Sequence, residues 1–276
     1  MNIDHFHCIG SEHVSNAKPC QDYSRTYIDA SRGIFAGAIA DGCSGSKGDP
    51  SVGAMFLVND YLQIVKHELY QTSPDIGIKD SLIFGMKDLC DRGYCYDDFF
   101  ATLIGMVKTP TSFNVHWFGD GYVVLRYFDG IVKVKCIDYP FNMPAYLVHE
   151  LTEDIELFIA HTGNTYKLIT YTLNSDGELL STEEEDLKAT DYLTLDLQPE
   201  VESLASVSIF SDGLGLLKGD EPAPLYWKDC TAALNLTTFA NVKGDFVKRA
   251  VTARFNRKKK FIPFDDYSQV TYVSYD

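Results

Sequence analysis

The chain has 276 residues, 45% of them hydrophobic and 23% charged, and 39 acidic against 24 basic residues give a formal net charge of −15. These values are ordinary for a globular protein, and the negative charge argues against binding to nucleic acid or to an anionic membrane. No apolar run approaches the roughly 18 residues that span a bilayer, and no signal-peptide pattern opens the sequence. Without a long linker or repeat, we expect a single domain over 1–276, in the cytoplasm, where its seven cysteines stay reduced.

The N-terminal part of the chain predicts strands followed by two helices. The strands are predicted at 5–10, 23–28 and 33–41, the last being almost continuously apolar and therefore typical of a buried central strand. Stripes at helical spacing run from Val58 to Leu69 and from Ile78 to Leu89. Asp49-Pro50 suits the start of the first helix, because aspartate caps helices and proline favours their first position.

Strand patterns dominate the rest of the chain. They predict strands at 101–107, 113–118, 123–127, 131–136, 156–160, 206–210 and 269–275. A late stripe predicts a helix near 246–253, the acidic stretch 181–191 is interpreted as a solvated loop or helix start, and the basic run 257–260 as an exposed loop. Because strands and helices do not alternate regularly, the order favours an α+β fold of layered sheets and helices.

Aspartates stand at the ends of several predicted strands. Asp-Gly is a common turn dipeptide, and Asp129 and Asp176 are interpreted as plain turn residues. The remaining acids directly follow or precede an apparently buried strand; they are Asp22, Asp41, Asp120, Asp212, Asp265 and Asp266. Carboxylates that gather at one edge raise each other's pKa, and divalent cations relieve that conflict. Oxygen ligands suit Mg²⁺, Mn²⁺ or Ca²⁺, so the pattern predicts a carboxylate metal site.

Five short motifs then follow one another along the chain. They are Cys20-Gln21-Asp22, Ala40-Asp41-Gly42, Gly119-Asp120-Gly121, Ser211-Asp212-Gly213-Leu214 and Asp265-Asp266-Tyr267-Ser268. In this order the chain resembles the metal-dependent PP2C-like Ser/Thr phosphatases, and Pro19-Cys20-Gln21-Asp22 resembles their bacterial-type branch. The resemblance extends from residue 20 to residue 268. It implies a four-layer αββα sandwich, in which two antiparallel sheets pack face to face with helices outside.

The same resemblance implies the activity and its residues. It implies hydrolysis of phosphoserine, phosphothreonine or a similar phosphomonoester by direct attack of a water that bridges two metals, with a phosphorylated protein or a small phosphoester as substrate. The implied catalytic residues are Asp22, Asp41, Asp212 and Asp265. Two or three Mn²⁺ or Mg²⁺ ions would be held by Asp22, Asp41, Gly42, Asp120, Asp212 and Asp265. Asp41 would bridge two metals, and Asp120 with Asp212 would share a third.

Three positions depart from the family pattern. Gln21 replaces a common glutamate, Cys43 follows Asp41-Gly42 where a histidine can act as general acid, and Ala17 stands near the place of a phosphate-binding arginine. Lys18 is the nearest cation, and we hypothesise that it binds phosphate instead. The departures leave two alternatives open: a degenerate member that serves as a binding or signalling module, and a calcium-stabilised structural protein. The sequence does not indicate a regulatory partner or an oligomeric state.

Overall fold

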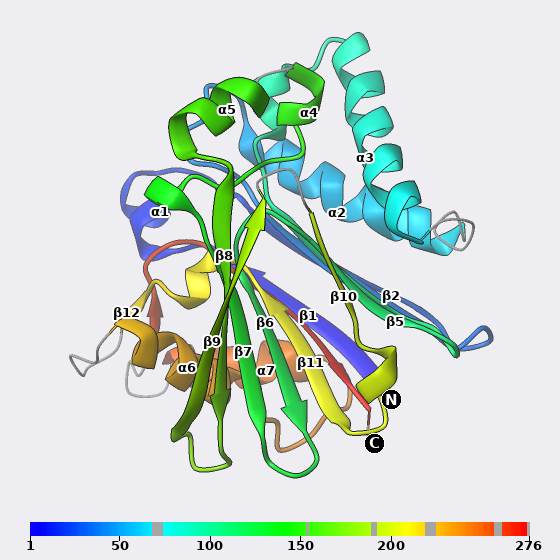
Figure 1. Ribbon diagram of the computed structural model, residues 1–276, viewed down its shortest axis with the longest axis vertical. Coiled ribbons are helices and arrows are strands. Elements are labelled where there is room, and N and C mark those ends of the chain that lie inside the picture. The colour runs from blue at the N-terminus through cyan, green and yellow to red at the C-terminus, as the bar shows by residue number, and fades with distance from the viewer. Residues whose placement is uncertain (68–73, 153–154, 189–191, 219–224, 257–260, 275–276) are drawn as a thin grey trace.

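The computed structural model describes residues 1–67, 74–152, 155–188, 192–218, 225–256 and 261–274 (Figure 1). Its larger sheet has seven strands in the order β1 (Asn2–Cys8), β14 (Tyr267–Val273), β11 (Leu204–Phe210), β6 (Tyr122–Tyr127), β7 (Val132–Asp138), β8 (Thr165–Leu173) and β9 (Leu179–Lys188). The second sheet has the order β10 (Leu193–Asp196), β5 (Phe113–Phe118), β4 (Leu103–Lys108), β3 (Ile34–Asp41) and β2 (Asp22–Asp29). A small third sheet pairs β12 (Leu217–Lys218) with β13 (Ile262–Pro263).

Helices cover the outer faces of the two large sheets. Helices α2 (Pro50–Lys66) and α3 (Pro74–Asp91) lie on the side of the five-stranded sheet, and α6 (Leu225–Leu236) and α7 (Phe246–Asn256) on the side of the seven-stranded sheet (Figure 1). The shorter helices are α1 (Ser11–Ser15), α4 (His149–Thr152) and α5 (Ile155–Thr162). The described strand pairs of both large sheets are antiparallel. The predicted αββα sandwich is therefore confirmed.

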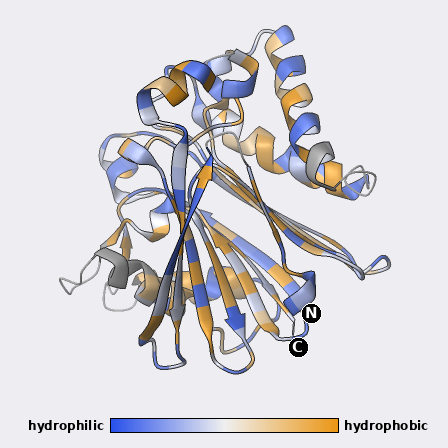
Figure 2. Ribbon diagram, in the orientation of Figure 1, coloured by the Kyte–Doolittle hydropathy of each residue, from blue (hydrophilic) through white to orange (hydrophobic). Residues whose placement is uncertain are grey.

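Strand β3 shows how the pattern of residues builds the layers. Ile39 faces the other sheet and joins a core with Val207 and Val270, whereas Ala38 and Ala40 face α2. Side chains alternate across a strand, so one strand supplies two hydrophobic cores, one between the sheets and one under the helices. Figure 2 shows the alternation of hydrophobic and hydrophilic residues along the strands of the larger sheet.

The predicted start of α2 is confirmed, and two predicted elements are wrong. Asp49 caps α2 by accepting a hydrogen bond from the Ser51 backbone N–H at 3.2 Å, and the helix begins at Pro50. The stretch 156–160, predicted as a strand, lies in α5, where Phe158 and Thr162 are buried one helical turn apart. The acidic stretch 181–188, predicted as a loop or helix start, belongs to strand β9. Residues 189–191, the basic run 257–260 and the predicted helical position Leu69 lie outside the described residues.

Strand β9 is exposed along almost its whole length, so burial gives it no alternating pattern. It is held by backbone pairing with β8, to which the Lys167–Glu184 ion pair of 2.6 Å is added. Acidic side chains are well suited to an edge strand, because they discourage pairing with another chain. Among the described helices, none is long and apolar enough to cross a membrane.

Candidate active site

Asp22 and Asp41 meet because β2 begins where β3 ends. The two strands are antiparallel neighbours, and their register places Asp22 directly opposite Asp41. Directly opposed residues of antiparallel strands point to the same face of the sheet. The two acids, 19 positions apart in the sequence, therefore stand side by side at one sheet edge.

The backbone after Asp41 is fixed by neighbouring segments. Gly42 donates its N–H to the Gln21 carbonyl at 3.2 Å and forms an isolated bridge with Ala101. A Cβ atom at Gly42 would lie only 2.7 Å from the Pro50 carbonyl oxygen. Residue 42 must therefore be glycine, because the start of α2 packs directly against it. This contact fixes the position of the Asp41-Gly42 turn.

Asp212 and Asp265 come from adjacent strands of the other sheet. Asp212 follows β11 and Asp265 precedes β14, and these strands pair with each other. At Gly213 a Cβ atom would lie 1.9 Å from the Asp266 carbonyl oxygen, so only glycine allows the two turns to lie against each other. The two sheets thus bring their acid-bearing ends to a common edge.

Asp120 lies in the turn between β5 and β6. The turn has Gly119 at φ 97° and Gly121 at φ 119°, a left-handed backbone that favours glycine. A Cβ atom at Gly121 would come within 2.6 Å of the Phe210 carbonyl oxygen, which places the turn against the end of β11 and next to Asp212.

These carboxyl groups interact strongly with one another. Asp41 shares side-chain hydrogen bonds with Asp22 and Asp212, and burial together with both neighbouring charges raises the pKa of Asp41. Burial, with the charges of Asp212 and Asp266, raises the pKa of Asp22 to about 7. Burial and the charge of Asp212 raise the pKa of Asp120 to about 8. Burial is also the largest cause of the raised pKa of Asp212, and Asp265 adds to it.

This crowding fits oxygen-ligated divalent cations. Ser211 Oγ donates a 2.7 Å hydrogen bond to Asp22 Oδ2, whereas Asp22 Oδ1 is buried without a hydrogen-bond partner among the described residues. A buried carboxylate oxygen without a donor is costly, and a cation satisfies it. The side chains of the predicted site residues Asp22, Asp41, Asp120 and Asp212 therefore interact with one another, and Asp265 interacts with this group through its charge on Asp212.

The structure adds a histidine that the sequence analysis missed. His13, in α1, is buried, and its Nδ1 forms a 2.8 Å hydrogen bond with Asp266 Oδ2. Its Nε2 lies 3.0 Å from Ser44 Oγ and 3.7 Å from Asp265 Oδ1. His13, Asp265 and Asp266 together form a group whose ligand atoms are close enough to hold a metal ion.

Asp266 anchors this network through both carboxylate oxygens. Oδ1 accepts from the Gly10 N–H at 2.7 Å, and Oδ2 accepts from the Gln21 N–H at 2.5 Å as well as bonding His13. Ser44 Oγ in turn bonds Gln21 Oε1 at 2.6 Å. The segment 11–22 shows no periodic pattern, so nothing in the sequence ties His13 to residues more than 250 positions away.

The two other positions singled out from the sequence differ in their surroundings. Lys18 is exposed, and its backbone N–H donates to the His13 carbonyl at 2.9 Å, so it lies directly after the helix α1 that carries His13. Cys43 is partly exposed, its N–H donates to the Phe100 carbonyl at 2.8 Å, and its thiol is in hydrogen-bonding contact with the Tyr146 hydroxyl.

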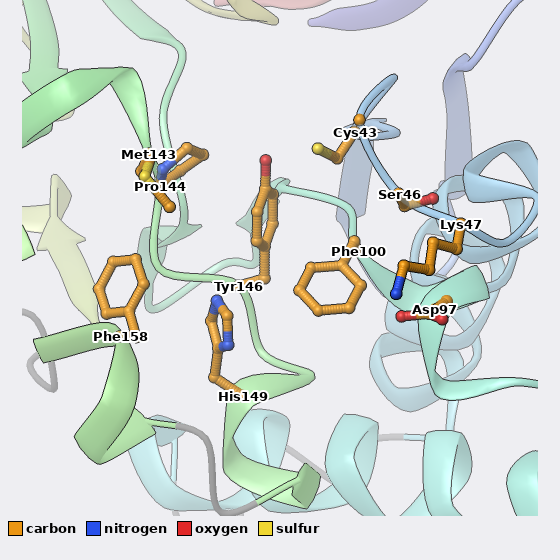
Figure 3. A pocket seen from close by; sticks show the side chains of 11 residues that line it. Cys43, Ser46, Lys47, Asp97, Phe100, Met143, Pro144, Tyr146, His149 and Phe158 are labelled. Atoms are coloured by element: carbon orange, nitrogen blue, oxygen red, sulfur yellow. The ribbon is translucent and has the colours of Figure 1, made fainter. Parts of the chain in front are cut away.

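A pocket of about 320 Å³ opens beside the carboxylates at Cys43. We call it the aromatic pocket; its walls are Cys43, Gly45, Ser46, Lys47, Asp97, Phe100, Met143, Pro144, Tyr146, His149 and Phe158 (Figure 3). The Tyr146 ring stands in it with its hydroxyl toward Cys43 (Figure 3). Burial is the largest cause of the raised Tyr146 pKa, and the Asp120 and Asp41 charges contribute to it, which places the hydroxyl near the carboxylates.

Comparison with known proteins gives a consistent answer. The family profile of "Protein phosphatase 2C" matches residues 9–242. The chain is 24% identical over 185 residues to serine/threonine-protein phosphatase 3 of Escherichia coli (strain K12), covering 59% of this chain and 69% of that protein. The crystal structure of a bacterial serine phosphatase has a TM-score of 0.53 at 15% identity, covering 99% of this chain and 97% of the other. A point variant of a bacterial serine phosphatase has a TM-score of 0.54 at 14% identity, with the same coverage.

Proposed function

Because the chain belongs to the protein phosphatase 2C family, we propose that it is a metal-dependent phosphatase that hydrolyses phosphoserine or phosphothreonine. The observation that carries the proposal is the meeting of Asp22, Asp41 and Asp212, from three strands and two sheets, in one hydrogen-bonded group. Such crowding destabilises the folded protein unless cations compensate it, and it is therefore difficult to explain as a structural feature alone.

The positions of the acids suggest a division of roles. Asp41 contacts both Asp22 and Asp212, so it is the carboxylate best placed to be shared between two cations, with the Gly42 backbone beside it. Asp265 would complete one cation site with Asp212, and Asp120 would form a weaker site with Asp212. Mn²⁺ or Mg²⁺ bound there would neutralise phosphoryl charge and lower the pKa of water, making it a nucleophile.

The remaining residues would hold the substrate and the acids in place. Lys18 is exposed on the loop that leads from α1 to Asp22, and we propose that it contacts the phosphoryl group. His13 and Asp266 would fix the segment that carries Asp265. The serine/threonine-protein phosphatase among the relatives supports a phosphorylated protein as the substrate.

The proposal places the enzyme in the cytoplasm. Among the described residues, the seven cysteines form no disulfide, which is typical of a reducing compartment. A role in signalling by reversible phosphorylation follows from the substrate class, and the net charge of −15 favours protein substrates over nucleic acid.

Hydrolysis of a phosphopeptide panel in Mn²⁺, in Mg²⁺ and in chelator tests the proposal. We expect activity that requires the cation, and we expect Asp41→Asn or Asp212→Asn to lower kcat at least about a thousandfold, since each removes a shared ligand. Lys18→Glu should raise KM more than it lowers kcat. Asp129→Asn is the matched control, because Asp129 also precedes a glycine but lies in an exposed turn, where its side chain accepts from the Ile131 N–H.

Two results would contradict these roles. Near-normal turnover in both Asp41→Asn and Asp212→Asn would show that neither acid is needed for catalysis. A wild-type protein that binds Mn²⁺ but hydrolyses neither phosphopeptides nor small phosphoesters would instead be a binding or signalling module, the alternative that Gln21 and Cys43 keep open.

A further inference from the structure

We propose that the aromatic pocket is a specificity subsite, which takes a large apolar side chain next to the phosphorylated residue of a peptide substrate. The inference rests on the proposed function and extends it from the reaction to the choice of substrate. Its basis is the position of the pocket, its walls and its size.

The pocket borders the carboxylate site. Cys43 lies two positions after Asp41, and its N–H bonds the carbonyl of Phe100, another wall residue. The Tyr146 hydroxyl contacts the Cys43 thiol and is influenced by the charges of Asp41 and Asp120. Tyr146 thus stands between the two compartments. An extended peptide advances about 3.3 Å per residue, so we expect the side chain that enters the pocket to lie within two positions of the phosphorylated residue.

Four rings give the pocket a preformed shape. Phe100 packs edge-on against Tyr146 at 5.6 Å and against His149 at 5.4 Å, and His149 packs on Phe158 at 4.9 Å between ring centroids. Rings that hold one another lose little further freedom when a ligand binds, which favours binding. The rings come from separate elements: Phe100 precedes β4, and the other three lie between β7 and β8.

The size and charge of the pocket indicate its occupant. A volume of about 320 Å³ lies at the lower limit of small-ligand pockets, and it suits one large side chain better than a cofactor. Met143, Pro144 and Phe158 add an apolar wall. Lys47 and Asp97 lie at the same end of the pocket in Figure 3, and their opposite charges favour neither an acidic nor a basic occupant.

Phosphoserine peptides with Ala, Leu, Phe or Arg at each position within two residues of the phosphoserine test the inference. At one position we expect Phe and Leu to raise kcat/KM about tenfold or more over Ala, while Arg does not, as burial of an apolar side chain predicts. The Ala peptide gives the baseline within each variant, so a change in basal activity cancels from the ratio.

Two pocket variants and one control locate the effect. Met143→Ala removes part of a wall that is already 47% exposed, and Gly45→Leu fills the pocket from a position where an added Cβ would have Cys43 Sγ as its nearest atom, at 3.7 Å. Both should reduce the Phe-to-Ala ratio toward one. Leu157→Ala is the control, because Leu157 neighbours Phe158 in α5 but is 61% exposed and outside the pocket lining, and it should leave the ratio unchanged.

Binding of the same peptides with a non-hydrolysable phosphonate, measured by calorimetry, separates the two proposals. A Phe-over-Ala preference that disappears in Gly45→Leu supports the subsite even if hydrolysis is absent, which would refute only the phosphatase function. Equal affinity for all peptides, a preference for Arg, or an unchanged Phe preference in both pocket variants would overturn the subsite, whatever the enzyme hydrolyses.

Discussion

His13, in α1, is the side chain that joins the Gly10 and Gln21 backbone in linking the N-terminal segment to the acids near the C-terminus. Its two ring nitrogens contact different partners, Nδ1 bonding Asp266 and Nε2 facing Ser44 and Asp265. Asp266 is buried, and loss of a donor to a buried carboxylate costs on the order of 1–3 kcal/mol. A shift of Asp266 after loss of this donor should also displace Asp265, the adjacent proposed metal ligand.

His13→Ala should therefore raise the Mn²⁺ concentration for half-maximal hydrolysis about tenfold or more. His13→Asn keeps a donor close to the Nδ1 position and should recover most of the loss, whereas His13→Gln, which resembles the Nε2 side, should recover less. His161→Asn serves as the control, since His161 is exposed in α5, away from the acids, and its Nδ1 bonds the Leu157 carbonyl. A lower melting temperature with an unchanged Mn²⁺ dependence would show that His13 is merely structural.

The acids of the site could be found from the sequence because each stands where a buried strand begins or ends. Asp41 and Asp212 follow apolar runs. Antiparallel pairing sets Asp41 opposite Asp22 and brings the segment of Asp212 beside that of Asp265, and the packing of the two sheets brings the two pairs together. His13 could not be found in this way. It lies in a polar segment without periodicity, and its partners are defined only by tertiary contacts such as the Gly10 N–H bond to Asp266.

At the scale of elements, the sequence predicted the strands of the sandwich better than the segment between β7 and β8. Buried strands such as β5 have the expected pattern, because one face meets the other sheet and the other meets a helix. Strand β9 has no buried face, and its acidic composition resembles a loop. Helix α5 is short and apolar, and its periodicity cannot be distinguished from that of a strand until its partners are known.

Glycines explain how the elements come close enough to form the site. A Cβ atom would lie 2.2 Å from the Asp265 backbone at Gly10 and 1.9 Å from that of Asp266 at Gly213. The segments around Gly10 and Gly213, distant in the sequence, therefore both pack against the turn that carries Asp265 and Asp266. The sequence shows where these glycines are, but it does not show which backbone segment each of them packs against, because that depends on the tertiary fold.

For the whole molecule, the crowded acids make stability depend on pH and on cations. The pKa of Asp120 is raised to about 8 and that of Asp22 to about 7, against about 4 in an unfolded chain. Between pH 4 and 8 the metal-free folded state thus holds more protons than the unfolded state. The free energy of unfolding in chelator should therefore fall as pH rises through this range.

Asp120→Asn should make the metal-free protein more stable at pH 8, by on the order of 1–2 kcal/mol. This is less than the pKa shift alone would give, because Asp120 is partly exposed and water screens its charge. Denaturant unfolding in chelator measures the change, and Asp176→Asn, in an exposed turn, is the control. If the free energy of unfolding of the wild-type protein in chelator rose between pH 4 and 8, the clustered carboxylates would not be destabilising the folded state.

Anomalous X-ray diffraction from crystals soaked in Mn²⁺ tests whether acids far apart in the sequence share divalent cations. We expect anomalous peaks within about 2–2.5 Å of carboxylate oxygens of Asp41 and Asp212, with Asp265 also binding one of the ions, and we expect these peaks to disappear in Asp41→Asn crystals. Peaks that avoid Asp41 and Asp212 at saturating Mn²⁺, in a preparation that hydrolyses phosphopeptides, would contradict this expectation.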